Sequence, residues 1–347
     1  MKKILLLLVS ITALLSASCE KDPLPPAKDW EGTLVVTDIS SDVTWYSDSV
    51  YTLRGRIAVK TGGTLTIQPG CIIKGEPGSG ANGSCLIVAQ GAKIYAYGTA
   101  AKPIIFTSTA DSIKPGQLVS PNLDETFTGL WGGLIICGYA PISATISPVQ
   151  IEGIPVTDVN GLYGGLDSLD NSGVLQYVSI RHGGTNIGQG NEINGLTLGG
   201  VGMGTTIDHV EVVANQDDGI EVFGGNVGIR YTLVWNQQDD AFDLDQAYSG
   251  FFNHYISVVS NGQHDKALEF DGGEGPWNAS FNMLNGMVIS PDTALFDFRD
   301  KATGYISIHG TFKANHRDGT NVTIDTLPNP INTNEFNWTW AKAAGKI

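Results

Sequence analysis

Short rows of alternating apolar and polar residues fill the chain from about residue 55 onward. Each row holds three to six strand-forming residues and is closed by Gly, Pro or Asn. Rows this short are not typical of the hairpins of a β-sandwich, and they predict strands that each form one side of a coil. The clearest rows lie at residues 63–75, 85–98, 103–108 and 131–138.

A second pattern repeats itself at intervals of 22 and 26 residues. Asp217-Asp218-Gly219-Ile220-Glu221-Val222 returns as Asp239-Asp240-Ala241-Phe242-Asp243-Leu244, and a looser third copy spans residues 265–271. A period in the low twenties with apolar alternation is typical of a solenoid in which each repeat adds one rung.

These motifs resemble a known family. The strings GTLTIQPGCIIKG and LIVAQGAKIYAYG, and later DDGIEVFGG and WNQQDDAFDLDQ, are similar to the rungs of right-handed parallel β-helix proteins of the pectate-lyase-like superfamily that Bacteroidetes secrete. The similarity covers about residues 55–310. It implies an all-β, single-stranded right-handed parallel β-helix, and it implies no particular reaction.

The N-terminus has the features of a lipoprotein signal. A basic start, an apolar run over residues 4–15 and three small residues precede Cys19. Twelve residues are too few for a membrane-spanning helix, which needs about 20. We expect cleavage after residue 18, lipidation of Cys19 and anchoring to the cell outer membrane with the protein surface-exposed. A periplasmic protein with a cleaved signal is the alternative.

The rest of the chain divides by composition. Residues 19–40 are predicted to be a tether, 41–320 the β-helix and 321–347 a C-terminal cap over the last rung. Residues 110–128 and 143–172 lack alternation and predict long loops that leave the coils, which are often functional. Alternation with isoleucine places Cys71 and Cys137 in strands as core thiols.

Net charge excludes one class of partner. The formal charge is −15, and removal of residues 1–18 takes away Lys2 and Lys3, which gives −17. Affinity for nucleic acid depends on cationic side chains that neutralise phosphates, so nucleic acid is not an expected partner.

The repeats place carboxylates in register. Glu221, Asp243, Glu269 and Asp297 are each flanked by apolar residues. If those neighbours point into the coil, the acids point outward, and successive rungs lie about 4.8 Å apart. Two like charges about 5 Å apart repel by roughly 0.8 kcal/mol in water and roughly 3 kcal/mol at a dielectric near 20. Bound cations, basic partners or raised pKa values must therefore compensate the column.

Further acids lie in neighbouring register columns, and basic residues occupy the last positions of these columns. Lys266 and Arg299 stand where another acid would overload the stack, and Arg230 and Lys301 are near enough in sequence to join them. The predicted ligand-binding residues are Glu221, Asp243, Asp245, Glu269 and Asp271, with Trp235 and Tyr248 as stacking platforms for sugar rings.

Three interpretations of the acids remain open. Repeated aspartate in turns is ordinary turn chemistry and requires no ligand. Oxygen-only clusters suit calcium, for which Asp217, Asp239 and Asp265 are the candidates. The third interpretation is catalysis.

The catalytic interpretation rests on a second resemblance. Polygalacturonase-type glycoside hydrolases are β-helices with Asn-x-Asp, Asp-Asp, histidine and Arg-x-Lys on successive rungs. This chain offers a similar order in Asn215-Gln216-Asp217-Asp218, Asp239-Asp240, His264 and Arg299-Asp300-Lys301, without the Gly-His-Gly of those enzymes. The resemblance implies Asp240 as general acid, Asp218 and Asp239 as water-activating bases, and Arg299 and Lys301 as binders of a substrate carboxylate.

The sequence thus predicts a surface-anchored β-helix lipoprotein whose acidic face binds a polysaccharide, a cell-surface glycan or a cation-bridged polymer. The alternatives are a polysaccharide-cleaving enzyme, either a hydrolase or a lyase, and a purely structural envelope protein.

Overall fold

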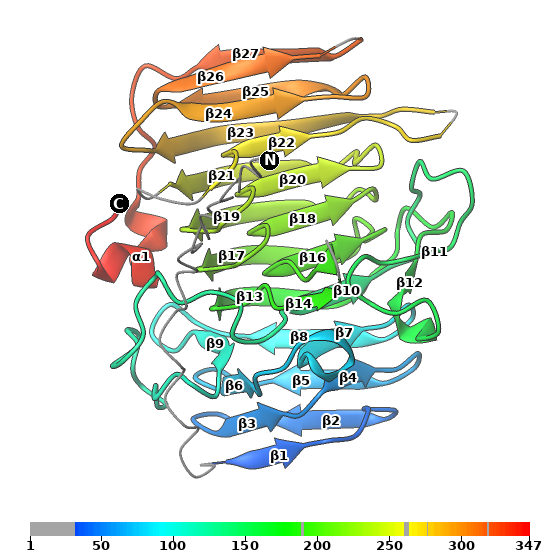
Figure 1. Cartoon of the computed structure of the whole chain (residues 1–347), viewed down its shortest axis with the longest axis vertical. Helices are drawn as coiled ribbons and strands as arrows, with labels where there is room; N and C mark the ends of the chain where they lie inside the picture. Colours follow the sequence, from blue (N-terminus) through cyan, green and yellow to red (C-terminus); the bar gives the residue numbers. More distant parts are fainter. Residues whose placement is uncertain (1–31, 189–190, 260–263, 276, 318) are drawn as a thin grey trace, which may run out of the picture.

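The chain coils as a parallel β-helix, and each turn of the coil contributes strands to three faces (Figure 1). This computed structural model describes residues 32–188, 191–259, 264–275, 277–317 and 319–347. The predicted signal peptide, Cys19 and the first part of the tether lie outside the described residues. No helix among the described residues is long and apolar enough to cross a membrane.

Faces 1 and 2 start as separate columns of short parallel strands and then merge. Face 1 begins with β2 (Asp42–Trp45), β5 (Thr64–Ile67) and β8 (Lys93–Tyr97). Face 2 begins with β1 (Thr33–Val35), β3 (Val50–Leu53), β6 (Ile72–Gly75) and β9 (Ile104–Ser108). Strand β13 pairs with β8 through its first half and with β9 through its second half, so from here one long strand serves both faces. The long strands are β13 (Gly173–Arg181), β17 (Thr206–Val213), β19 (Gly228–Trp235), β21 (Phe251–Val258), β23 (Ser280–Ile289), β25 (Thr303–His309) and β27 (Asn321–Thr326).

Face 3 is a separate nine-stranded parallel sheet. Its strands are β4 (Arg56–Val59), β7 (Cys85–Val88), β10 (Leu134–Cys137), β16 (Leu196–Gly199), β18 (Ile220–Phe223), β20 (Phe242–Asp245), β22 (Leu268–Phe270), β24 (Ala294–Phe298) and β26 (Phe312–His316). The short pairs β11 (Val149–Gln150) with β12 (Leu162–Tyr163) and β14 (Asn186–Gly188) with β15 (Asn191–Glu192) lie outside the coil sheets.

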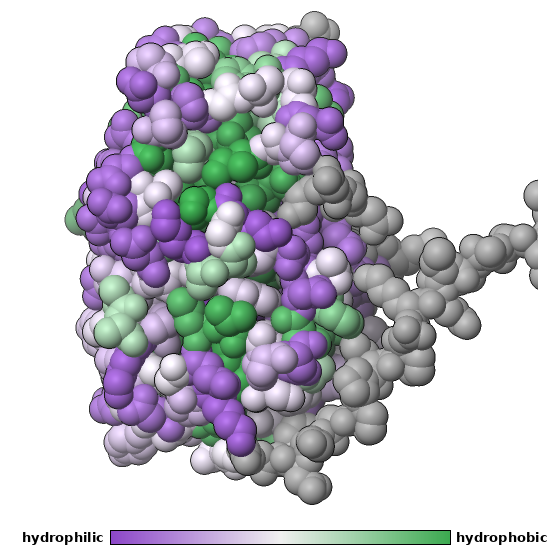
Figure 2. Space-filling model, turned by 90° about the vertical axis from the view of Figure 1, so that its left-hand side faces the viewer, coloured by the Kyte–Doolittle hydropathy of each residue, from purple (hydrophilic) through white to green (hydrophobic). Residues whose placement is uncertain are grey.

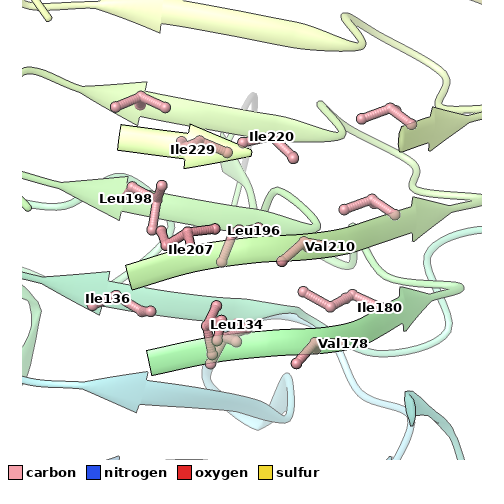
Figure 3. Close-up of a cluster of buried hydrophobic side chains, with 14 of the residues drawn as sticks. Leu134, Ile136, Val178, Ile180, Leu196, Leu198, Ile207, Val210, Ile220 and Ile229 are labelled. Atoms are coloured by element: carbon pink, nitrogen blue, oxygen red, sulfur yellow. The ribbon is translucent and has the colours of Figure 1, made fainter. Parts of the chain in front are cut away.

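The core is a continuous stack of aliphatic side chains inside the coil. Leu134, Leu196 and Ile220 lie in register on face 3, and Val178 and Val210 lie in register on face 2; all five are fully buried (Figure 3). Because alternate strand residues point to opposite sides, the apolar members of each row fill the interior and the polar members face outward. The predicted all-β parallel β-helix is confirmed.

The long strands change direction at one register position. Tyr177, His209, Tyr231 and His254 occupy it, each with φ between 50° and 60° in the left-handed region. Their rings stack along the outer edge, with centroids 4.2, 4.6 and 4.9 Å apart. This bend lets one strand pass from face 1 to face 2 without an intervening loop.

The two predicted loops are present between β9 and β10 and between β10 and β13. The first lies over face 2, where the guanidinium of Arg181 donates a hydrogen bond to the carbonyl of Leu118 at 2.7 Å. The second packs Ile142, Ile151 and Tyr163 against the outer side of face 3. Each loop therefore covers the outside of a sheet that would otherwise be open.

The C-terminal segment differs from the prediction. Residues 321–326 form β27, a further rung paired with β25, and the chain then turns back along face 2. The short helix α1 (Trp340–Ala343) lies beside the middle coils (Figure 1). Phe336 and Trp340 pack against the outer residues of β17, β19 and β21. Figure 2 shows the molecule from this side, where apolar and polar residues are interspersed. The prediction of a cap over the last rung is wrong, and the coil spans residues 33–326 rather than 41–320.

Buried polar groups attach this segment. The Glu211 carboxylate accepts hydrogen bonds from the Ala341 N–H at 2.9 Å and from the Ser179 hydroxyl at 2.6 Å. Arg181 lies with its guanidinium carbon 4.9 Å from the centroid of the Trp340 ring. Both predicted core thiols are fully buried, and burial raises the pKa of Cys71 to about 12.

Candidate functional site

A ladder of side chains stands at the corner that leads into face 3. The backbone N–H of Asp240 donates to the Asp218 carboxylate at 2.9 Å, and the N–H of Lys266 donates to the Asp240 carboxylate at 2.7 Å. Each aspartate thus satisfies a backbone donor of the next rung. Asp218 and Asp240 are only 7% and 3% exposed, so turn structure accounts for part of their role.

The outward positions of face 3 carry the acid column: Glu221, Asp243, Glu269 and Asp297. Glu221 pairs in register with Asp243, Asp243 with Glu269, and Glu269 with Asp297. The flanking residues, such as Ile220 and Phe242, point into the core. The predicted stacking of carboxylates on one outer face is therefore confirmed. The column is nevertheless largely buried, since Glu221, Glu269 and Asp297 are 6%, 3% and 3% exposed.

Basic side chains compensate the C-terminal half of the column. Lys266 Nζ lies 2.6 Å from Glu269 Oε2, and Arg299 pairs with Glu269 and also lies 3.5 Å from Asp297 Oδ2. Lys266 and Arg299 hold the compensating positions that the repeat predicted. Arg317 adds an ion pair of 2.6 Å to Asp297, which the sequence reading missed. The sequence could have predicted this ion pair. Phe298 pairs with His316, so the residues that follow them, Arg299 and Arg317, lie in the same register column on successive rungs.

The N-terminal half lacks this compensation. One carboxylate oxygen from each of Asp218, Glu221 and Asp243 lies within 4.8 Å of the others, and within the described ranges these three residues form no ion pair. The charge of Arg299 acts on Asp243 and opposes the rise of its pKa, but Arg299 forms its ion pairs with other acids. The amide of Asn194 donates to Glu221. Burial, followed by repulsion from neighbouring acids, raises the pKa of all three carboxyls well above the usual range.

Neighbouring acids titrate near neutrality. Burial and the charge of Asp218 raise the pKa of Asp240 to about 8, although Lys266 opposes the shift. Burial raises the pKa of Asp245 to about 7 and that of Asp271 to about 6. Burial and mutual repulsion therefore favour the protonated forms of carboxyl groups across the acidic face.

The residues predicted to bind calcium fall into two adjoining groups. Carboxylate oxygens of Asp217, Asp218 and Asp239 lie within 4.8 Å of one another, and so do those of Asp239, Asp240 and Asp265. Asp239 belongs to both groups, whereas Asp217 and Asp265 share none. Oxygen-only donor sets of this kind fit calcium.

The residues predicted from the polygalacturonase resemblance converge only in part. Asp218, Asp239 and Asp240 meet at the corner between faces 2 and 3, and half-buried His264 lies two residues before Lys266. Arg299 directly follows β24 at the other edge of face 3, and Lys301 is exposed in the turn beyond it. The clustered carboxylates are also closer than the roughly 6.5–9.5 Å between the carboxyl groups of inverting glycosidases.

The predicted aromatic platforms are not on the acidic face. Trp235 and Tyr248 are 1% and 2% exposed, and Tyr248 donates its hydroxyl hydrogen bond to the buried carbonyl of Val227 at 2.6 Å. Neither ring is accessible to a ligand, so the prediction that Trp235 and Tyr248 stack on sugar rings is wrong. Arg230 does not join the acid column either, because it lies on β19, in another sheet.

Comparison with known proteins identifies a family. A family model described as a pectate-lyase like beta helix domain matches residues 37–296. No curated protein and no solved structure matches the chain significantly.

The raised pKa of Asp240 predicts how stability depends on pH. The folded state keeps a proton up to about pH 8, whereas the unfolded state releases it near pH 4, so stability falls as pH rises through this window. Asp240→Asn keeps the side-chain oxygen that accepts from Lys266 and removes the charge. We expect a flatter pH profile and a gain of about 1–3 kcal/mol in the free energy of unfolding at pH 8.

Denaturant unfolding of the wild type and the variant at pH 5 and pH 8, in chelator, measures this effect. Asp292→Asn, which changes an exposed acid in the turn before β24, is the matched control and should follow the wild type. Parallel profiles for wild type and Asp240→Asn would contradict the assignment.

Proposed function

The chain belongs to the family of pectate-lyase-like β-helix domains, and on that premise we propose that it is a carbohydrate-binding protein rather than an enzyme. In this proposal the acidic face binds an anionic glycan through bridging calcium. One observation carries the proposal: one carboxylate oxygen from each of Asp218, Glu221 and Asp243 lies within 4.8 Å of the others, and none of the three forms an ion pair among the described residues.

Electrostatics supports a cation at this end of the column. Lys266, Arg299 and Arg317 neutralise the other end, so the uncompensated end is where a divalent ion relieves the most repulsion. Asp217, Asp239 and Asp265 extend the same oxygen-rich surface toward solvent, since Asp239 and Asp265 are exposed. A bound calcium ion with free coordination positions takes carboxylate or hydroxyl oxygens from a second molecule.

The burial of the predicted catalytic acids favours binding over cleavage. A general acid must reach the glycosidic oxygen, but Asp240 is 3% exposed and is held by the N–H of Lys266. Hydrolysis or elimination on a uronic-acid polymer remains the second candidate because Asp240, with its pKa near 8, is protonated at neutral pH as a general acid must be.

Calcium should stabilise the protein and support glycan binding. At pH 8 we expect excess calcium to raise the melting temperature by several degrees relative to chelator, with a smaller rise at pH 5, because protonated carboxyls must first release their protons. Asp243→Asn should remove most of the response, and the exposed Asp292→Asn should retain it. Retention on immobilised polygalacturonate should likewise require calcium. Identical melting curves with and without the ion would refute the calcium bridge.

The two functional classes differ in turnover. We expect no reducing ends and no unsaturated products when the protein is incubated with a panel of uronic-acid polymers. If products do form, and Asp240→Asn abolishes them while Asp292→Asn does not, the protein is an enzyme and the binding proposal fails.

We also propose that Cys19 carries a lipid that anchors the protein to the cell outer membrane with the β-helix exposed. Cys19→Ala should move the protein from the membrane fraction to the soluble fraction without changing its melting temperature, since the coil begins at β1. Protease treatment of intact cells should degrade the wild-type protein at the surface. Membrane association of Cys19→Ala equal to that of the wild type would argue against the anchor.

A further inference from the structure

The outer side of face 1 carries a groove. No residue of either long loop or of the C-terminal segment lines it. The groove has a volume of about 410 Å³ and crosses β17, β19 and β21. Thr206, Gly228, Phe251 and Asn282 lie in one register column along it. The groove therefore runs along the axis of the coil, across successive rungs.

An aromatic ring forms the floor of this groove. A Cβ added to Gly228 would lie 2.5 Å from two ring carbons of Phe251, so the ring lies directly against the backbone of β19 at Gly228. Only glycine leaves room for it. Phe251 is half-buried, and its ring contacts the side chain of Arg230.

Arg230 stacks on this ring. Its guanidinium carbon lies 4.7 Å from the centroid of the Phe251 ring, and the Arg230 side chain is exposed. Stacking on a ring uses the flat surface of the guanidinium and leaves the N–H groups at its edge free to donate. Asp208 occupies the adjacent register position, but its carboxylate lies 2.6 Å from His209 Nδ1. No ion pair of Arg230 is found among the residues that the structure describes.

Polar groups of the adjoining turns complete the walls. The side-chain oxygen of Asn226, Oδ1, accepts from the Met203 N–H at 3.1 Å, and the Ser249 hydroxyl donates to the Gly225 carbonyl at 3.1 Å. The Asn226 amide N–H groups and the Ser249 lone pairs are then available to hydroxyl groups of a ligand.

We propose that this groove binds the charged unit of an acidic saccharide, with its carboxylate or sulfate in the fork of Arg230 and its hydroxyls against Asn226 and Ser249. A planar fork matches these oxyanions and discriminates against neutral sugars. The inference rests on the carbohydrate class of the proposed function, but it requires neither calcium nor the acidic face.

The test uses short probes in chelator, so that the acidic face cannot contribute through a cation. Trigalacturonate, its fully methyl-esterified form and a sulfated trisaccharide are titrated against the full-length chain by calorimetry. We expect binding of at least one anionic probe, at least tenfold weaker binding of the methyl ester, and at least tenfold weaker binding to Arg230→Gln. The preferred probe identifies carboxylate or sulfate as the recognised group.

Three variants separate the alternatives. Arg230→Lys keeps the charge and removes the fork, and it should also bind at least fivefold more weakly. Arg54→Gln removes the same charge from a distant rung, where Arg54 pairs with Glu76, and should bind like the wild type. Asp243→Asn should lose the calcium response and keep this binding, so failure of the acidic face and failure of the groove are distinguishable. Absence of binding to every anionic probe, equal binding of the methyl ester, or wild-type affinity in Arg230→Gln would overturn the proposal.

Discussion

The structure depends on one constraint: each rung must place its residues directly over those of the rung before it, at the spacing of hydrogen-bonded strands. Whatever occupies a register position is therefore repeated along the axis. Inside the coil this constraint produces the aliphatic stack of Leu134, Leu196 and Ile220, in which every side chain has a similar neighbour above and below. Outside the coil it forces like charges together, and the chain has to compensate them.

The acid column shows two physical solutions side by side. Toward the C-terminal end, Lys266, Arg299 and Arg317 meet the carboxylates directly. Toward the other end burial and mutual repulsion raise the pKa of Asp218, Glu221 and Asp243 well above the usual range, because their ionised forms are unfavourable there. The proposed cation site lies at this second end because a proton on a carboxyl group is displaced more easily than a fixed basic side chain.

The repeat explains why much of this arrangement could be predicted from the sequence. A difference of 22 residues between Glu221 and Asp243 is enough to predict their register, because the intervening residues complete one coil. Lys266 and Arg299 followed from the same alignment. Side chains without a repeated partner could not be placed in this way. Trp235 lies under the C-terminal segment, whose path over the middle coils depends on contacts with residues more than 100 positions away, such as Ala341 with Glu211. Arg230 lies on a different sheet from the acid column, although it is near enough in sequence to join it, because proximity in sequence does not distinguish the outer sides of faces 1 and 3.

The three faces differ in what covers their outer sides, and this difference determines where a ligand can bind. Face 2 is covered by residues 109–133 and by the C-terminal segment, and the first rungs of face 3 are covered by residues 138–172. The second loop reaches the first rungs of the acid column, since Tyr163 packs against Phe223 of β18 with ring centroids 5.9 Å apart. Phe223 is followed in its register column by Asp245, so an apolar outer residue that the loop covers gives way to a charged one on the next rung. Within the described residues, two outer surfaces are left without such a cover: the rest of the acid column on face 3 and the groove on face 1. Both run along the axis of the coil, and extended surfaces of this kind in solenoids suit a polymeric ligand more than a small one.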